Sequence, residues 1–205
     1  MRFIHFKEQL GSFNVFSLRD IRMADSRFHR RRLNEWQEKG YIKKIVRGYY
    51  IFSDTRLSEP VLYEIANRIY SPSYVTCETA LAWYGLIPET TYGIVSASTR
   101  KTAGFSTFAG NFSYHSLLRR AFSGYTIVED RDARFKIAVI EKALIDYLYL
   151  HANLKAADDF ESLRINAEVF RAKVDRVKME SLCEKIGIKA LKNRVHGLLR
   201  YMNNA

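Results

Sequence analysis

The chain has 205 residues, 47% of them hydrophobic, so it is long enough to bury the core of one large domain or two small ones. Its 33 basic and 22 acidic side chains give a formal net charge of +11, which favours an anionic partner such as nucleic acid or a membrane surface. No apolar run approaches the roughly 20 residues of a membrane-spanning helix, and no signal-peptide core is present. The two cysteines, Cys77 and Cys183, are far apart and lie among apolar residues. We therefore expect a cytoplasmic protein with reduced, buried thiols.

The basic residues are concentrated at the start of the chain. Residues 1–52 carry twelve basic and five acidic side chains, a net charge of +7 out of the total of +11. The N-terminal quarter is therefore the part that we expect to meet an anionic partner.

The first elements are short. Apolar residues at helical spacing predict a helix that ends at Gly11, and they are Phe3, Phe6 and Leu10. A small strand is expected at residues 14–16. Ser17 then has the character of a helix N-cap, with Asp20 three residues later as a capping box.

An arginine-rich helix is predicted from Asp25 to Lys39, with Asp25 or Ser26 as its N-cap and Gly40 as its C-terminal glycine. At 100° per residue, one face can bury His29, Leu33 and Trp36. The opposite face carries Arg27, Arg30, Arg31 and Asn34. Arginine and asparagine can bind guanine and adenine edges bidentately in a major groove, so these four are the predicted base-reading residues.

A two-stranded ribbon is predicted behind this helix, with strands at 41–46 and 49–52 and a turn at Arg47-Gly48. The order helix, strand, helix, turn, helix, ribbon is typical of a winged helix-turn-helix, whose last helix enters the major groove. Lys43, Lys44 and Arg47 are then expected on phosphates. Ser17 and Ser26 are expected as caps that can also offer backbone N–H groups to phosphate.

The rest of the chain predicts a mixed α+β domain that ends in helices. Residues 53–58 read as a linker, which places the domains at 1–55 and 56–205. A helix at 138–150 is apolar on nearly all sides and carries only three charged residues, Glu141, Lys142 and Asp146. Lys142 and Asp146 are four residues apart and could pair. Two interpretations stay open for these three charges, an internal polar cluster that orients the helix or a functional motif.

The sequence contains no strong catalytic or metal-binding motif. The five histidines are dispersed, and no phosphate-binding glycine loop is present, so no metal, cofactor or enzymatic activity is predicted. Acidic residues beside a lysine invite comparison with a metal-dependent nuclease, and the set is Glu129, Asp130, Asp132, Glu141 and Lys142. Adjacent Glu141 and Lys142 would point to opposite sides of a strand, which speaks against that comparison. The hydroxyl-rich run 96–102 could cradle an anion or form an ordinary exposed loop.

Several motifs, in order, resemble the AbiEi family of type IV antitoxins. In the N-terminal part they are Arg32-Leu33, Trp36, Lys39-Gly40, Lys43-Lys44 and Arg47-Gly48-Tyr49-Tyr50. In the second part they are Ser73-Tyr74-Val75, Ala80-Leu81, Tyr84 to Glu89, Thr99-Arg100-Lys101 and Glu141 to Asp146. The matched stretches span roughly residues 13–150, and the tail beyond them matches no motif of the family.

The resemblance implies a bacterial transcriptional autorepressor that binds inverted repeats of double-stranded DNA in its own operon promoter. It also implies an antitoxin role, in which the second domain opposes a nucleotidyltransferase-like toxin without a stable complex. Two alternatives belong to other classes. One is a stand-alone regulator or a protein-interaction module that uses a winged helix, with the arginines facing an acidic partner, and the other is the nuclease.

Overall fold

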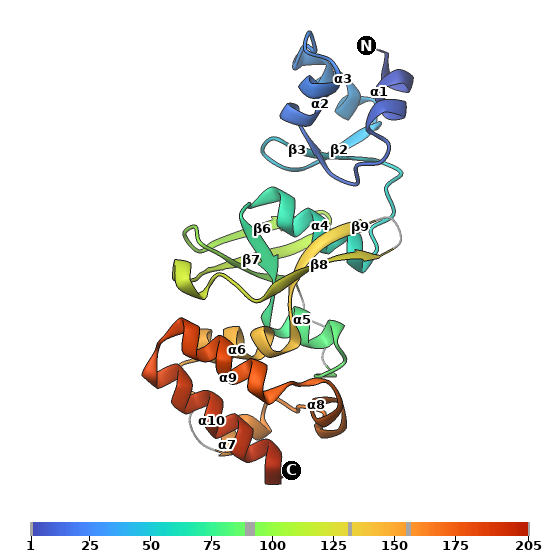
Figure 1. Cartoon of the computed structure of the whole chain (residues 1–205). Helices are drawn as coiled ribbons and strands as arrows, with labels where there is room; N and C mark the ends of the chain where they lie inside the picture. Colours follow the sequence, from blue (N-terminus) through green and yellow to red (C-terminus); the bar gives the residue numbers. More distant parts are fainter. Residues whose placement is uncertain (1, 89–92, 131–132, 155–156, 205) are drawn as a thin grey trace.

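The computed structural model describes residues 2–88, 93–130, 133–154 and 157–204. The molecule has three tiers (Figure 1). Short N-terminal helices and a small sheet form the first tier, a six-stranded sheet forms the second, and the C-terminal helices form the third. The two termini lie at opposite ends of the molecule. Mixed helices and sheets confirm the predicted α+β class.

The N-terminal unit consists of three helices and three strands. They are α1 (Phe3–Leu10), β1 (Phe16–Ser17), α2 (Leu18–Ala24), α3 (Arg31–Glu38), β2 (Ile42–Val46) and β3 (Tyr49–Phe52). The predicted first helix, with Gly11 directly after it, is confirmed. So is the predicted capping box, in which Ser17 and Asp20 satisfy each other's backbone N–H groups.

The small sheet has the order β1-β3-β2, with both pairs antiparallel. The β2–β3 hairpin turns at Arg47 and Gly48, as predicted, and Gly48 takes a φ of +90° that favours glycine. The register shifts between Lys44 and Val46, so Ile45 is an extra residue in β2. Such a bulge changes which face of the sheet the following side chains occupy.

The large sheet has the order β6-β7-β5-β4-β9-β8, with β4–β9 and β5–β7 parallel and the other pairs antiparallel. Its strands are β4 (Ser73–Val75), β5 (Ile94–Ser98), β6 (Ala103–Thr107), β7 (Gly110–Ser116), β8 (Tyr125–Asp130) and β9 (Ala133–Ala138). Residues 89–92, which precede Gly93 and β5, lie outside the described part. A 3-10 turn, η1 (Arg119–Ala121), leads into β8.

Helices cover both faces of the large sheet. The helix α4 (Glu59–Ile69) packs against β9, β4 and β5 on the side of the N-terminal unit (Figure 1). On the other side lie α5 (Cys77–Trp83) and the predicted central helix α6 (Ile140–Leu150). The remaining helices are α7 (Ala157–Glu161), α8 (Ala167–Lys173), α9 (Arg176–Ile186) and α10 (Lys189–Asn204). Both α9 and α10 pack on α6, which explains why α6 is apolar on nearly all sides.

The small sheet contributes to two apolar clusters. One face packs on α1, α2 and α3 through Phe16, Ile42 and Phe52. The other face packs on the large apolar cluster of the second unit, by which we mean the chain after residue 55, through Val15, Ile45 and Ile51. Residues 53–58 are neither helix nor strand, as expected of a linker. The division of the chain at residue 55 stays a prediction, since the parts before and after it share buried apolar contacts.

Candidate nucleic-acid interface

The arginine-rich helix begins at Arg31, six residues later than predicted. Asp25 does not cap it, because Asp25 ends α2 and its backbone N–H donates to the carbonyl of Ile21 at 2.8 Å. The Asp25 carboxylate accepts the backbone N–H of Arg27 at 3.0 Å, and its carbonyl accepts that of Phe28 at 3.1 Å. These bonds close a turn between α2 and α3 and leave Ser26 exposed in it.

Tertiary packing of Phe28 explains the late start. In a helix from Asp25, Phe28 would lie about 140° around the axis from Leu33, so both could not face one core. The turn lets the Phe28 ring reach Phe6 and Trp36, with ring centroids 6.3 and 5.4 Å apart. Phe28, Leu33 and Trp36 are all buried, whereas His29, predicted on the buried face, is exposed.

The predicted base-reading residues lie on the turn and the first turn of α3, and all are exposed, namely Arg27, Arg30, Arg31 and Asn34. The Arg31 side chain is 90% exposed and its Nε lies 3.9 Å from the Glu35 carboxylate. Glu35 therefore shares the exposed face with Arg31, one turn further along. The positive end of this face is its N-terminal half, which is the half that a major groove would meet.

The hairpin divides the three predicted phosphate contacts. Lys44 pairs with Tyr50 and shares the face of the small sheet that carries the helices. Lys43 pairs with Ile51 on the other face, and its ammonium lies 5.5 Å from the centre of the Phe108 ring in the second unit. Arg47 is exposed at the hairpin turn. Lys44 and Arg47 are thus exposed near α3, where a phosphate could reach them. Lys43 faces the second unit instead.

The helix α2 is held by an ion pair that sequence reasoning missed. Arg68 of α4 donates to Oδ2 of Asp20 at 2.7 Å, across 48 residues of sequence. Burial raises the pKa of Asp20, but hydrogen bonds from Ser17 and the charge of Arg68 outweigh it and hold the pKa below its ordinary value. The Ser17 backbone N–H is bonded to Asp20 at 2.7 Å, so the expectation that it can serve a phosphate is wrong.

A buried polar network surrounds the second predicted motif. Lys142 and Asp146 are ion-paired at 0% and 1% exposure, as their spacing predicted. Oδ2 of Asp146 also accepts hydrogen bonds from Tyr74 and Thr76, both at 2.8 Å, and Lys142 donates to the Tyr74 hydroxyl at 2.9 Å. Burial raises the pKa of Asp146, and the partners only partly offset it. Every charge here has a partner, which agrees with the structural interpretation of the motif.

Glu141 belongs to a separate contact. It is 2% exposed, its Oε2 lies 2.9 Å from Nζ of Lys178, and its Oε1 accepts the backbone N–H of Asp175 at 3.1 Å. These bonds tie the start of α6 to the start of α9. Glu141 thus joins two helices rather than joining the Lys142 network.

The carboxylates of the nuclease comparison do not converge. Glu129 is exposed on β8 and pairs with Arg134 across the hairpin at 3.2 Å, while Glu141 is buried on α6. Asp130 ends β8, and Asp132 lies outside the described residues. Within the described ranges, no three His, Cys, Asp or Glu side chains are grouped so as to hold a metal ion.

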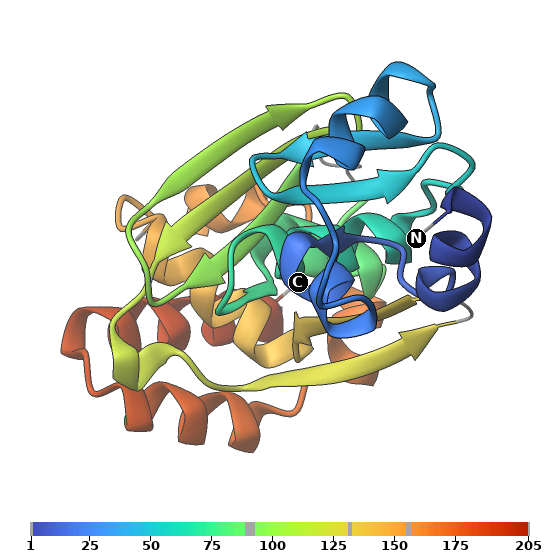
Figure 2. The same ribbon diagram turned by 90° about the horizontal axis from the view of Figure 1, so that it is seen from above.

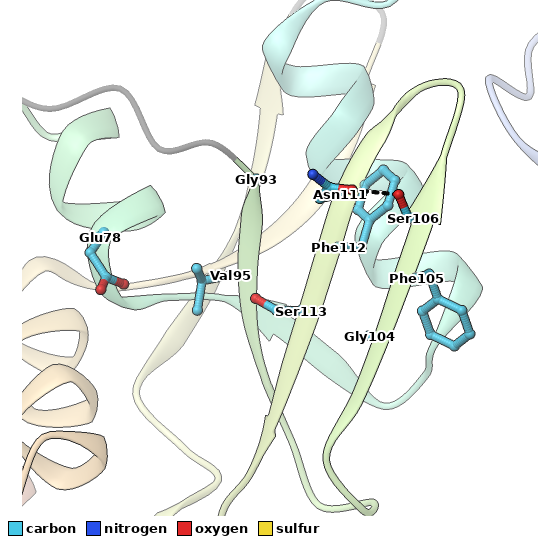
Figure 3. A pocket seen from close by; sticks show the side chains of 9 residues that line it. All are labelled: Glu78, Gly93, Val95, Gly104, Phe105, Ser106, Asn111, Phe112 and Ser113. Atoms are coloured by element: carbon cyan, nitrogen blue, oxygen red, sulfur yellow. Dashed lines mark hydrogen bonds between the residues drawn. The ribbon is translucent and has the colours of Figure 1, made fainter.

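The hydroxyl-rich run 96–102 is engaged in part, and the buried Ser96 hydroxyl has no hydrogen-bond partner among the described residues. Ser98 donates to the carbonyl of Pro72 at 2.7 Å and accepts the backbone N–H of Arg100 at 3.1 Å. A hollow of about 670 Å³ lies nearby on the face of β5, β7 and β6 (Figure 3). Residues of the three strands line it, and Glu78 of α5 lies at one side. None of the predicted base-reading residues lines it.

No protein-family model matches the chain, and no curated protein has a matching sequence. The resemblance to the AbiEi family therefore rests on the sequence motifs alone. In the part of the chain that the structure describes, every helix is too short or too polar to cross a membrane.

Two further basic residues deserve a place beside the predicted set. Arg19 and Arg22 are exposed on α2, the helix directly before the turn. The sequence carried a signal for them, since Arg19 and Arg22 are three residues apart and so share one face of a short capped helix. The predicted set followed the densest run of arginines and passed over them.

Proposed function

We propose that the chain is a cytoplasmic, sequence-specific DNA-binding repressor whose N-terminal unit is a winged helix-turn-helix. The observation that carries this proposal is the exposed set Arg27, Arg30, Arg31 and Asn34 on α3 and its preceding turn. Arginine and asparagine at the start of a helix are the side chains that read base edges in a major groove. The net charge of +7 in residues 1–52 supports a polyanionic partner for this unit.

The order of the elements supports the same proposal. Helix, strand, helix, turn, helix and hairpin follow one another, and β1 pairs with the second hairpin strand. In winged helices the hairpin lies beside the last helix and touches the DNA backbone. Lys44 and Arg47 suit that role.

The antitoxin role is the part of the proposal that the resemblance carries. We infer that the protein represses its own operon and opposes a nucleotidyltransferase-like toxin encoded beside it, without a stable complex. The test is growth of cells that express this neighbouring gene, with and without the full chain. Rescue of growth by the chain is expected. Unchanged toxicity would contradict the antitoxin role and leave the stand-alone regulator as the remaining interpretation.

DNA binding is tested by titrating the full chain against labelled DNA from upstream of its own coding sequence. Salt-sensitive, sequence-selective binding is expected. The double variant Arg27→Ala/Arg31→Ala should weaken it by about 30- to 20,000-fold, because each bidentate base contact is worth about 1–3 kcal/mol and the variant removes two of them. The matched control is Arg171→Ala/Arg200→Ala, which removes the same charge from exposed sites on α8 and α10. The control should bind within about twofold of the parent chain.

Three results would oppose the proposal. If both double variants weaken binding equally, net charge rather than the α3 face is responsible. If the chain ignores DNA and binds an acidic protein through the same arginines, the protein-interaction alternative holds. If the DNA is cleaved in the presence of Mg²⁺, the nuclease alternative returns.

A further inference from the structure

The two edges of the six-stranded sheet differ in how they are covered. At one edge, β2 of the N-terminal unit packs against β6, and Lys43 lies over the Phe108 ring at the end of the β6–β7 hairpin. At the other edge lies β8, the outermost strand of the sheet, with α9 extending beyond it in the view of Figure 2. Among the described elements, only β9 packs extensively against β8.

The strand β8 lacks several of the features that normally prevent edge strands from pairing, and its two charged side chains, Glu129 and Asp130, are confined to one end. It contains no proline and no lysine, and its register with β9 is continuous over six residue pairs without a bulge. Two large apolar side chains are exposed on it, Tyr125 at 36% and Ile127 at 48%. A regular strand edge with exposed apolar side chains at its centre is a template for another strand.

We propose that β8 pairs antiparallel with β8 of a second copy of the chain, about a two-fold axis at Ile127. Pairing would join the two six-stranded sheets into one and bury Ile127 against its counterpart. In this register Tyr125 lies opposite Glu129 of the second copy, and Thr126 lies opposite Val128. A two-fold contact closes on itself, so it gives a dimer rather than a fibre.

The charge distribution along β8 selects an antiparallel second copy as the occupant. Exposed Arg119 and Arg120 lie in η1 just before the strand. Asp130 lies at its end together with Glu129, which also pairs with Arg134 of β9. Antiparallel pairing brings the acidic end of each strand towards the basic end of the other. A parallel arrangement would place like charges together at both ends, which is unfavourable.

The first test is the mass of the full chain in solution, measured by sedimentation velocity from about 1 µM to about 500 µM, since a contact of one strand pair belongs to the small interface class. A species of twice 23.9 kDa is expected at the higher concentrations. Ile127→Lys should raise the dissociation constant by at least about 100-fold, because it buries two like charges at the axis. The control is Ile4→Lys on α1, where the side chain is 73% exposed, and it should remain dimeric.

Disulfide trapping tests the register and does not depend on how Ile127→Lys folds. Ile127→Cys should crosslink to itself, because directly opposed residues of antiparallel strands have Cα atoms about 4.5–5.5 Å apart, within the range of a disulfide. Tyr125→Cys should crosslink to Glu129→Cys in a mixture but not to itself. The native Cys77 and Cys183 are buried and give little background.

A chain that is monomeric at every concentration would overturn the proposal. A dimer that survives Ile127→Lys, or that crosslinks through Tyr125→Cys alone, would also overturn it. These measurements use no DNA, so their failure would leave the DNA-binding proposal untouched. If both proposals hold, the dimer presents two α3 helices related by a two-fold axis, the symmetry of an inverted repeat.

Discussion

Replacing Asp146 by asparagine tests whether the buried motif is structural. Asparagine keeps the shape of the side chain and can still accept hydrogen bonds from Tyr74 and Thr76. It cannot neutralise Lys142, which is fully buried and has Asp146 as its ion-pair partner. Asp146→Asn therefore leaves an ammonium group in the core beside the Tyr74 hydroxyl.

The expected loss follows from the burial of both partners. Removing one member of a buried ion pair costs about 3–5 kcal/mol, because the remaining charge stays desolvated. For a chain of this length each kcal/mol lowers the melting temperature by about 2–4 °C, so the decrease should be about 6–20 °C. The pair lies between α6 and β4 rather than near α3, so DNA affinity measured well below the melting temperature should not change.

Urea unfolding of four chains gives the coupling between the partners. They are the parent, Asp146→Asn, Lys142→Met and the double variant. The double variant removes both charges, so it should be more stable than the two single losses predict together. Glu161→Gln, a carboxyl-to-amide change at an exposed site, should alter stability by less than about 0.5 kcal/mol. A loss below about 1 kcal/mol for Asp146→Asn, or strictly additive effects, would refute the structural interpretation.

Two further predictions concern the N-terminal unit and the Lys142 stem. Asp20→Asn should lower stability by about 1–3 kcal/mol at pH 7, because it removes the negative charge that faces Arg68 and replaces one of the two acceptor oxygens by an NH₂ group. The pKa of Asp20 in the folded protein lies below its ordinary value of 3.8. The stabilisation is therefore fully present above a pH of 3.8 and is lost as the pH falls through the folded pKa. The difference in stability between parent and variant, measured by urea unfolding, should accordingly shrink in acid. Gly124→Ala should destabilise the chain more than Gly85→Ala in thermal unfolding. Both glycines have a φ near +70°, so alanine is strained at either site. Only at Gly124 would the new Cβ also lie 3.1 Å from a side-chain carbon of Lys142. Equal losses of stability would show that backbone strain alone acts.

Local signals predicted the elements whose cause is local. The Ser17–Asp20 capping box, the Arg47-Gly48 turn and the Lys142–Asp146 pair all depend on residues within four positions of each other. Hydrogen bonds and steric preferences at that range are properties of the sequence itself. Each was therefore predicted at the correct residues.

Non-local contacts decided the features that the sequence did not predict correctly. The start of α3 depends on where the Phe28 ring finds space, which is set by Phe6 on another helix. Helical spacing alone extends the helix back to Asp25, because Asp25 and Ser26 are good caps in isolation. The pair of Asp20 with Arg68 spans 48 residues and leaves no local trace. These contacts place the arginines on a turn as well as on a helix.

The small sheet links the α3 face to the second unit. Ile42 and Ile45 point to opposite faces of this sheet, and regular alternation before the bulge puts Lys44 on the face of the helices and Lys43 on the other. Contact with the second unit buries the side chains of Val15, Ile45 and Ile51. Each buried aliphatic side chain contributes up to about 1.5–3 kcal/mol, so these three couple the N-terminal unit firmly to α4 and its sheet. The α3 face is consequently positioned by the whole chain, and a fragment that ends near residue 55 would expose the apolar side of the sheet that supports it.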